Sequence, residues 1–483
     1  MKSIIGVDLG VEEVRVARIN EMGDPELTLN NENLCSTSSA VEFSDEKVII
    51  GSLARHSAGI TEHAFAEFLR DIGGGITHKT PHGTFSPSDL CTLLLRPLIE
   101  HVRLVYGEAS AVTIAIPYNL SGEARLEILR AATLAGIYKP NLINDSTAEA
   151  LYLRHAHKLK EGKHLLVNLR SGGADATVFE ITGNSLRIVQ TSGVQNLGMS
   201  DLRGEMLGII KDKLSALAGK EVRMSDLMTV YCISNHNADV TIETLGSRPT
   251  TTLKAWSTEA GRIEIEITRK EFEERIIHLT QQLMVLVKST LDQATTAKSK
   301  IKGCFLSASE IDRPFWAGCI ASVAGIQPLT TTEGSNAMGA ALFSSMNSSE
   351  KELPITGRDE LKGINLQDVA PYYVGILEID WLTQTKRNRI VIPKGELLPC
   401  KQTFELVADD LGRIPEVKVT TAYTAEGNAD SVTVLQTVHP TRTKTNSKHI
   451  LTISMNEGGL TFVNIRMDDK DSDSSYFTDS QPG

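Results

Sequence analysis

The sequence predicts a duplicated α/β domain with a cleft between its two halves, followed by a β-sandwich. Two strand–turn–strand units, residues 3–19 and 164–181, open the two halves. Each unit has an apolar strand, a turn with glycine and a return strand rich in β-branched or apolar residues. Repetition at this distance indicates a duplicated α/β unit. Near-alternating segments from residue 368 onward, separated by turn residues, indicate the sandwich.

The composition is that of an ordinary globular protein. The chain has 483 residues, of which 41% are hydrophobic and 23% are charged, enough for two or three domains. Its net charge of −11 argues against general binding to nucleic acids or to anionic membranes. We interpret two short basic clusters, residues 386–389 and 441–444, as solvated surface.

The N-terminus and the cysteines indicate a cytoplasmic protein. Residues 1–16 place three acidic side chains where a signal peptide needs an unbroken apolar core, and no apolar run is long enough to span a bilayer. The six cysteines show no paired metal spacing. His155, His157 and His164 lie in a strongly cationic stretch, which disfavours a metal ion. We therefore expect a reducing compartment and no metal centre.

The first half continues with two strand–helix pairs. Residues 112–116 predict a buried strand, Ser121 suits the N-cap of the next helix, and Gly136 suits its C-terminal cap. A short strand then leads into a second helix, in which Ser146 and Glu149 have the spacing of a capping box.

The second half ends in a helix of small residues, after which the composition changes. A helix with Thr268 and Glu271 at capping-box spacing precedes a strand at 302–309 and the small-residue helix at 334–345. The polar, proline-containing stretch that follows indicates a domain boundary.

These signals divide the chain into four segments. Residues 1–345 form the duplicated domain, and residues 346–367 form a linker. Residues 368–468 form the sandwich. The acidic, serine-rich tail, residues 469–483, has the composition of a disordered segment.

Five stretches of the sequence resemble motifs of the DnaK (heat-shock-70) family of chaperones, in the same order. They are IIGVDLG, VTIAIPYNLSGEARLEILRAATLAGI, LINDSTAEAL, VQNLGMSDL and DVAPYYVGI. The resemblance covers nearly the whole chain. It implies an actin-like ATPase domain of two lobes with a central cleft, followed by a peptide-binding β-sandwich. Typical members continue into a helical lid, whereas this sequence stops soon after the sandwich, so we expect an atypical member without a lid.

Residues that active members use for ATP hydrolysis are changed in this sequence. The two threonines that follow their first Asp-Leu-Gly are Val11 and Glu12 here, and their catalytic lysine aligns with Leu69. Their second phosphate turn begins with aspartate, and here it begins with Asn168. Because magnesium that bridges phosphates is held through carboxylates, a neutral Asn168 oxygen weakens such a site.

The elements that recognise the nucleoside are changed as well. The adenosine clamp of the family aligns with residues 227–230. The adenine turn of the family, Gly-Gly-x-x-Arg, aligns with residues 307–310, and Arg313 is displaced from the position of its arginine. The family's Glu-Pro pair becomes Asp145-Ser146. The resemblance therefore implies a degenerate nucleotide site, at which ATP or ADP is possible and Mg²⁺ is weakly held if at all.

Carried over residue by residue, the resemblance implies three groups of site residues. The catalytic positions are Asp8, Asp145 and the degenerate Asn168. The nucleotide-binding positions are Asp8, Gly10, Arg170, Gly172, Gly173, Gly198, Arg313 and Gly339. The peptide-binding positions are Ile376, Ile379, Phe404, Val407, Val417 and Val419. The peptide-binding set either lines an apolar cleft or forms the plain core of the sandwich.

Arg170 has two interpretations. Its guanidinium pairs well with phosphate and could restore phosphate affinity, or it is a surface charge that fills an empty cleft. Gly172 and Gly173 can still shape a backbone nest for an anion. Asp8 and Asp145 would repel each other in the absence of a metal. We therefore expect a neighbour such as Arg170 or Arg70 to pair with them.

The function that the resemblance implies is a chaperone or co-chaperone that assists protein folding with little or no ATP hydrolysis. Its expected partners are unfolded or nascent polypeptide and, as a scaffold at the ribosome, a J-domain protein. Two alternatives stay open. One is a working ATP-dependent chaperone, and the other is an actin-fold small-molecule kinase, which the appended sandwich disfavours.

The linker predicts that the two domains are not coupled. Family members that switch carry four apolar residues before Asp-Val-x-Pro, whereas residues 364–367 read Ile-Asn-Leu-Gln here. Burying an unpaired amide costs about 1–3 kcal/mol. We therefore expect this linker not to dock on the first domain.

Overall fold

The chain folds into two compact units. The computed structural model describes residues 2–257, 261–295, 300–348, 363–379, 386–407, 416–422, 432–438, 447–467 and 475–476. The first unit contains residues 1–159, 183–189 and 334–483, and the second unit contains residues 160–182 and 190–333. Most of the predicted linker, nearly all of the predicted tail and the basic cluster at 441–444 lie outside the described residues.

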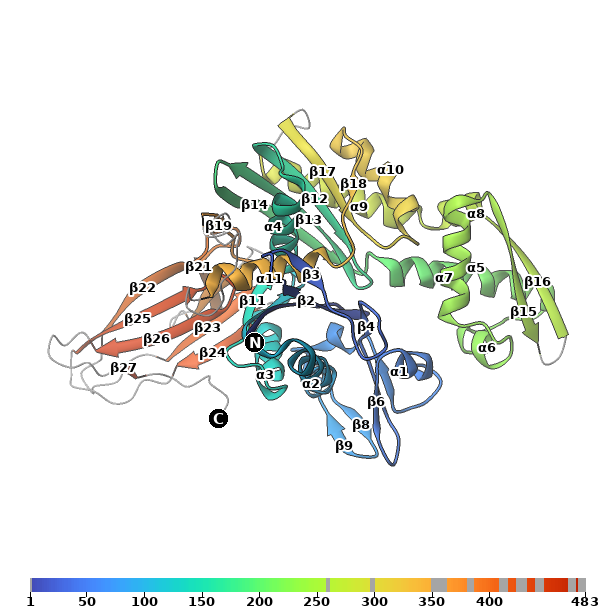
Figure 1. Cartoon of the computed structure of the whole chain (residues 1–483), viewed down its shortest axis with the longest axis horizontal. Coiled ribbons are helices and arrows are strands. Elements are labelled where there is room, and N and C mark those ends of the chain that lie inside the picture. The colour runs from blue at the N-terminus through green and yellow to red at the C-terminus, as the bar shows by residue number, and fades with distance from the viewer. Residues whose placement is uncertain are drawn as a thin grey trace. The chain divides into compact units, whose positions relative to one another are not determined.

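The first unit is built on a mixed sheet with the strand order β11-β10-β1-β2-β3. Figure 1 labels three of these strands, β11, β2 and β3. Strand β1 (Lys2–Leu9) pairs in parallel with β10 (Glu108–Ile116) and antiparallel with β2 (Glu13–Ile19). The β1–β2 pair confirms the first predicted strand–turn–strand unit. Strands β3 (Pro25–Leu27) and β11 (Asn141–Asn144) complete the order.

Four helices pack on this sheet, and two of them, α2 and α3, contribute buried side chains to one hydrophobic core together with its strands. They are α2 (Pro87–Tyr106), α3 (Gly122–Leu134), α4 (Asp145–His157) and α11 (Ser335–Asn347). The N-cap prediction for α3 is confirmed, because the Ser121 hydroxyl accepts a hydrogen bond from the Ala124 N–H at 3.0 Å. The small-residue helix is also confirmed as α11.

Shorter elements extend the first unit beyond the β1–β2 hairpin. They are β4 (Thr37–Ser38), β5 (Ala40–Phe43), β6 (Val48–Ile50), α1 (Ser52–Ser57), β7 (Ala64–Ala66), a 3₁₀ helix η1 (Phe68–Asp71), β8 (His78–Thr80) and β9 (Gly83–Phe85).

The second unit repeats the hairpin-centred plan. Strand β12 (Gly162–Leu169) pairs antiparallel with β13 (Gly173–Thr182), which confirms the second predicted unit. On its other edge β12 pairs in parallel with β17 (Ile301–Ser307), which is followed by β18 (Leu329–Thr330). Strand β14 (Ser185–Gln195) has residues in both units.

In the described residues, the remaining elements of the second unit are six helices and a hairpin. They are α5 (Met199–Ala218), α6 (Met224–Thr229), α7 (Asn235–Ser247), β15 (Thr250–Ser257), β16 (Gly261–Thr268), α8 (Arg269–Arg275), α9 (Ile277–Gln293) and α10 (Arg313–Ala324). Thr268 caps α8 as predicted, with its hydroxyl 3.1 Å from the Glu271 nitrogen. None of the helices in the described part of the chain combines the length and apolar character needed to cross a membrane.

A buried histidine lies in the core of the second unit. The His164 ring is 2% exposed, stacks on Phe179 at 5.2 Å between ring centroids, and faces Phe305. Its Nε2 is 2.8 Å from the Lys160 carbonyl oxygen. Because a carbonyl only accepts, Nε2 donates and Nδ1 is the deprotonated nitrogen, buried without a hydrogen-bond partner. Burial lowers the pKa of His164 below its usual 6.5.

We expect the free energy of unfolding to fall on acidification, in part through His164. The unfolded state takes up this proton first, so the contribution is complete above pH 6.5 and is lost as the pH falls through that value. His164→Phe should cost about 1 kcal/mol at pH 7.5 through the lost hydrogen bond. The variant should also lose less stability than the wild type between pH 7.5 and pH 5. Equal losses in urea titrations at the two pH values would contradict this assignment.

As far as the structure describes it, the sandwich consists of two four-stranded sheets. One has the order β21-β20-β23-β24 and the other has the order β22-β25-β26-β27. Apolar side chains from both sheets, including Val374, Val419 and Leu451, are fully buried between them. The strands are β20 (Tyr373–Ile379), β21 (Lys386–Ile392), β22 (Cys400–Val407), β23 (Val417–Ala422), β24 (Thr433–Val438), β25 (Lys448–Met455), β26 (Thr461–Met467) and β27 (Ser475–Tyr476).

The expectation that the end of the linker does not dock is wrong in this structure, whereas the absence of coupling between the two domains stays a prediction. Residues Asn365–Gln367 form strand β19, which pairs in parallel with Ser185–Arg187 of β14 inside the first unit. Strand pairing uses backbone groups, so the side chains do not decide it. The Asn365 side chain is exposed, and no unpaired amide has to be buried there.

Candidate functional site

The second hairpin ends in a closed polar cluster. Asn168 is fully buried at the end of β12 and lies opposite Asp175 of β13. Asn168 Nδ2 donates to Asp175 Oδ2 at 3.1 Å, and Arg170 Nη1 lies 2.7 Å from Asp175 Oδ1. Both carboxylate oxygens are therefore engaged by neighbours in the same hairpin. Sequence reasoning missed Asp175 as the partner of Arg170, although the two residues lie in the same short hairpin.

Burial and charge oppose each other at Asp175. Burial raises the pKa of Asp175 above its usual value, and the Arg170 guanidinium and the Asn168 amide act against that rise. The Arg170 side chain is 20% exposed and that of Asp175 is 5% exposed. A carboxylate this deeply buried needs such partners to stay charged. The Asn168 Oδ1 atom is buried with no hydrogen-bond partner.

The glycine at the start of α5 serves close packing against this turn. A Cβ atom at Gly198 would collide with the carbonyl group of Arg170. The N–H groups of Met199 and Ser200 donate to the carbonyls of Arg170 and Ser171, both at 3.3 Å. The Gly198 N–H donates to Asp201 Oδ2 at 2.9 Å. The first N–H groups of α5, which an anion could otherwise use, are thus bound to the protein's own oxygens.

The predicted glycines of the turn have a structural role of the same kind. The Arg170 N–H donates to the Gly173 carbonyl at 3.0 Å and closes the turn. The Gly172 carbonyl accepts from the Asn196 N–H at 3.2 Å. A Cβ atom at Gly173 would lie 2.6 Å from the Val194 carbonyl oxygen. Residues 170–173 therefore hold the hairpin tightly against the segment that precedes α5.

The first hairpin is closed by its own backbone. The Gly10 N–H donates to the Glu13 carbonyl at 3.1 Å, and the Ser39 hydroxyl donates to the Gly10 carbonyl at 2.8 Å. Val11 packs against the core of the first unit. Asp8 lies near the end of β1 and pairs in register with Arg15 of β2.

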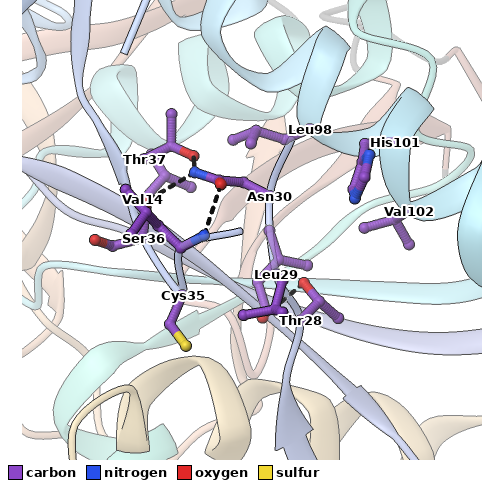
Figure 2. A pocket seen from close by; sticks show the side chains of 12 residues that line it. Val14, Thr28, Leu29, Asn30, Cys35, Ser36, Thr37, Leu98, His101 and Val102 are labelled. Carbon is purple, nitrogen blue, oxygen red and sulfur yellow. Dashed lines mark hydrogen bonds between the residues drawn. The ribbon is translucent and has the colours of Figure 1, made fainter. Parts of the chain in front are cut away.

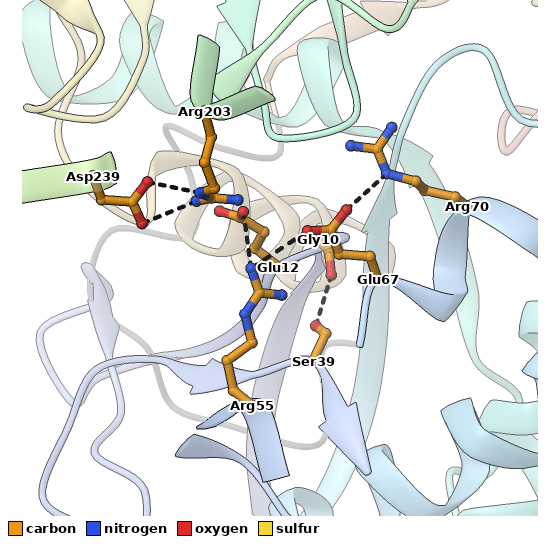
Figure 3. Close-up of polar contacts among 8 residues, drawn as sticks. All are labelled: Gly10, Glu12, Ser39, Arg55, Glu67, Arg70, Arg203 and Asp239. Atoms are coloured by element: carbon orange, nitrogen blue, oxygen red, sulfur yellow. Dashed lines mark hydrogen bonds and ion pairs between the residues drawn. The ribbon is translucent and has the colours of Figure 1, made fainter. Parts of the chain in front are cut away.

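Ion pairs surround the first hairpin (Figure 3). Arg55 Nη2 lies 3.1 Å from Glu12 Oε1 and 3.4 Å from Glu67 Oε1. Arg70 Nε lies 3.2 Å from Glu67 Oε2, so Glu67 connects the two arginines. Leu69, which aligns with the family's lysine, is 5% exposed and belongs to the core. Carboxylates at this turn are unfavourable neighbours for phosphate because the charges repel.

A further ion pair in Figure 3 belongs to the second unit. Arg203 of α5 reaches Asp239 of α7 with two hydrogen bonds, of 2.7 and 3.1 Å. The Arg203 side chain is 8% exposed. A bidentate pair of this kind fixes the two helices against each other.

Two buried acids lie one turn apart on α4. Asp145 is 1% exposed and accepts from the Ser146 N–H at 2.7 Å, and Glu149 is fully buried. The predicted capping box of Ser146 and Glu149 is wrong, because α4 begins at Asp145 and Glu149 lies in its interior. Glu149 Oε1 instead accepts from the Ser335 hydroxyl at 2.7 Å. Sequence reasoning missed Glu149 as a buried acid because local spacing offered a simpler explanation.

The other predicted nucleotide positions have identifiable local roles. Gly339 lies where α11 crosses α4, and a Cβ atom there would collide with the Ala148 backbone. Arg313 begins α10, where its Nη2 is 3.6 Å from Glu310 and its Nη1 donates to the Thr330 hydroxyl at 3.3 Å. These two residues belong to different units.

The first unit also contains a small pocket (Figure 2). None of the residues that line it is a predicted site residue. Apolar side chains of β2 and α2 and the loop 28–37 line it. Asn30 organises that loop, because its Nδ2 donates to the Ser36 carbonyl and to the Thr37 hydroxyl at 2.8 and 2.9 Å. Its Oδ1 accepts from two backbone N–H groups of the same loop.

The predicted peptide residues divide between core and surface. Ile376, Val417 and Val419 are 8%, 5% and 0% exposed and belong to the sandwich core. Phe404 is half-buried against that core, and Val407 is 51% exposed. Ile379 is the last residue of β20, and its side chain lies outside the described residues.

The sandwich is held to the first sheet by a buried polar network. Arg125 of α3 is fully buried, and its guanidinium donates to the carbonyls of Tyr118 and Gly458, both at 2.9 Å, and to Asn144 Oδ1 at 2.8 Å. Asn144 Nδ2 in turn donates to Asp368 Oδ2 at 3.0 Å. One cation thereby connects a helix of the first sheet with two segments of the sandwich.

Asp368 receives further donors within this network. The Thr147 hydroxyl donates to its Oδ2 at 2.6 Å, and the Val369 N–H donates to its Oδ1 at 2.7 Å. Burial raises the pKa of Asp368, opposed by these hydrogen bonds and by the charge of Arg125. A buried carboxylate with this many donors is a strong and specific contact.

Two aromatic side chains complete the junction. The Tyr372 hydroxyl donates to the Gly459 carbonyl at 2.7 Å and lies against Gly122 at the start of α3. Lys394 of the sandwich lies 5.4 Å from the ring centroid of Tyr118, and burial lowers the pKa of Lys394. The first sheet and the sandwich therefore share a packed interface with buried hydrogen bonds.

The two hairpin units and the appended sandwich have the architecture that the sequence resemblance implies. A family model described as Hsp70 protein matches residues 70–474, and the chain belongs to the Hsp70 family. Membership implies an actin-like ATPase domain with a β-sandwich and suggests a chaperone role. Members of the family generally bind ATP or ADP with Mg²⁺, and typically bind unfolded polypeptides and J-domain proteins.

The second hairpin does not fit magnesium. Magnesium needs hard oxygen ligands, mostly carboxylate and water. Asp175 has both oxygens engaged by Arg170 and Asn168, and the strand-end residue Asn168 offers a neutral oxygen. Within the described ranges, no three His, Cys, Asp or Glu side chains gather as a metal site requires. The residues of this hairpin therefore do not suit a magnesium nucleotide.

Proposed function

We propose that this chain is an Hsp70-family chaperone that binds unfolded or nascent polypeptide and hydrolyses ATP very slowly or not at all. The observation that carries the proposal is the Arg170–Asp175–Asn168 cluster. It uses the carboxylate of the second hairpin for an internal ion pair. The buried Leu69 in place of a lysine supports the same conclusion.

The division into domains that the sequence predicts belongs to this proposal. Residues 1–345 form the ATPase-type domain, 346–367 the linker, and 368–468 the substrate-type sandwich, followed by the tail at 469–483. The buried network around Arg125 and Asp368 supports a fixed arrangement of the sandwich on the first sheet. A fixed arrangement suits a scaffold that a J-domain protein engages at the ribosome, in the cytoplasm.

We expect no ATP turnover at the pace of active family members. Loss of a positioning or proton-transfer group costs about 10²–10⁴-fold in rate, and Leu69 and Asn168 each replace such a group. Single-turnover hydrolysis of radiolabelled ATP measures this directly. Rapid turnover that Asp8→Ala abolishes would contradict the proposal and favour an ATP-dependent chaperone instead.

We place the polypeptide-binding site of the sandwich at the edge of β22. Within the described residues, β22 pairs only with β25, so its other edge carries unpaired backbone groups that an extended chain can use. Half-buried Phe404 and exposed Val407 lie along this strand. An apolar side chain of the bound chain gains about 1.5–3 kcal/mol from full burial.

We expect Phe404→Ala to weaken binding of an apolar peptide to the full chain by about tenfold, because part of that burial is lost. Fluorescence anisotropy with a labelled leucine-rich peptide measures the change. Thr403→Ala, at an exposed neighbouring position, is the matched control and should bind within twofold of the wild type. Absence of saturable binding to the wild type would reject the polypeptide site.

A further inference from the structure

The two edge strands β21 and β22 lie next to each other at one side of the sandwich. In the described residues, β21 and β22 are each an edge strand of their sheet, and the two strands contact each other. The guanidinium of Arg389 on β21 lies over the ring of Phe404 on β22, at 5.0 Å from the ring centroid. A basic side chain thus lies over one face of the aromatic ring at the proposed polypeptide site.

The basic residues of β21 share the face that carries the predicted peptide residue Ile376. Arg389 lies opposite Ile376 in the register, and Arg387 lies opposite Glu378. Residues two apart on a strand point to the same face, so Arg387 and Arg389 lie on the same side of the sheet as Ile376. Both arginines are exposed. This places the basic segment at the edge of the polypeptide site, where the sequence analysis had assigned it to solvated surface.

Among the described residues, the positive charge of this strand is only partly balanced. Glu378 Oε1 lies 2.6 Å from Arg389 Nε, and it faces both Arg389 and Arg387. On the neighbouring strand, Glu405 is engaged by Lys448 at 2.8 Å. The chain as a whole has a net charge of −11, so a strand with three cations in four residues, 386–389, is a local exception.

We propose that this site selects extended polypeptides that carry an acidic residue beside the apolar anchor. The proposal rests on the proposed function, because it specifies which polypeptides the sandwich binds. The edge of β22 supplies backbone hydrogen bonds, Phe404 contacts the apolar anchor, and the arginine pair receives the carboxylate. A guanidinium presents paired N–H donors that match a carboxylate, and the ring beneath Arg389 keeps that group in place.

The test compares three labelled nonapeptides that share a leucine-rich centre and differ only in the flanking residues, which are Glu, Gln or Lys. Fluorescence anisotropy with the full chain at 50 mM NaCl gives the three affinities. We expect the Glu peptide to bind about threefold to tenfold more tightly than the Gln peptide, and the Lys peptide to bind most weakly. The ratio of Glu-peptide to Gln-peptide affinity should fall toward one in 1 M NaCl, because salt screens exposed charges.

Three variants show whether the arginines cause the preference. The double variant Arg387→Gln/Arg389→Gln should bring the ratio of Glu-peptide to Gln-peptide affinity to about one. Glu378→Gln removes the competing carboxylate and should raise that ratio. Lys418→Gln removes a cation from β23, at a position that alternates with the inward-facing Val417 and Val419, and should leave the ratio unchanged.

The outcomes separate this inference from the proposed function. If the Gln peptide binds and the Glu peptide binds no better, the acidic preference is wrong and the polypeptide site stands. The same conclusion follows if the preference survives the double arginine variant. If none of the three peptides binds, the proposed function fails, and the inference fails with it.

Discussion

Replacing Arg125 by methionine is expected to destabilise the protein by about 3–5 kcal/mol, because removing one partner of a buried charged network leaves the rest unsatisfied. The methionine fills much of the volume but donates no hydrogen bonds. The carbonyls of Tyr118 and Gly458 and the Asn144 amide oxygen would lose their donor. Asp368 would keep its buried charge without the nearby cation that favours it.

The measurement is urea unfolding followed by tryptophan fluorescence, together with limited proteolysis of the sandwich. Arg130→Met is the matched control, since Arg130 lies on the same helix but is exposed. The control should change stability by less than about 0.5 kcal/mol. If Arg125→Met is as stable as the control and no more sensitive to protease, the polar network does not hold the sandwich to the first sheet.

Local signals in the sequence predicted the elements of the fold well. The two hairpins, the Ser121 and Thr268 caps and the small-residue helix α11 each depend on residues close together in the chain. Hydrophobic periodicity and helix capping depend on residues that are close in the chain, so a single sequence reveals them. The family assignment succeeded for a related reason, because five short motifs in order could be compared directly, and it is confirmed by the match over residues 70–474.

The partners within the site could not be predicted, because they come from distant parts of the chain or from competing local geometry. Glu149 had a plausible capping partner three residues away, yet it hydrogen-bonds Ser335. Asp368 is 221 residues from Thr147, and its donors depend on how the sandwich packs. The expectation that the linker does not dock depends on the polarity of its side chains, whereas residues 365–367 dock through the backbone of β19.

The basic strand illustrates a different limit. Three cations in four residues, 386–389, are most often solvated, and the sequence contains nothing that contradicts this interpretation. Only the register with Ile376 and the contact between Arg389 and Phe404 place the charges beside an apolar site. A functional meaning for such a cluster therefore depends on which face of the sheet it occupies.

The second large effect is expected at Arg170. Arg170→Met removes the cation that lies 2.7 Å from Asp175 and leaves the buried carboxylate with the hydrogen bond from the Asn168 amide. We expect a loss of about 3 kcal/mol in the free energy of unfolding. Arg170→Met combined with Asp175→Asn removes the charge together with its partner and should lose only about 1 kcal/mol. The double variant should therefore be more stable than the single variant.

The dependence on pH distinguishes this mechanism from simple loss of packing. Burial already raises the pKa of Asp175, and loss of Arg170 removes the charge that opposes the rise. A carboxyl group with a raised pKa destabilises the native state at neutral pH and ceases to do so as the pH falls through that pKa. The cost of Arg170→Met should thus shrink between pH 7 and pH 4.5 in urea titrations, while that of the double variant stays constant. A cost that is the same at both pH values, or a double variant less stable than Arg170→Met, would mean that the ion pair does not balance the buried charge.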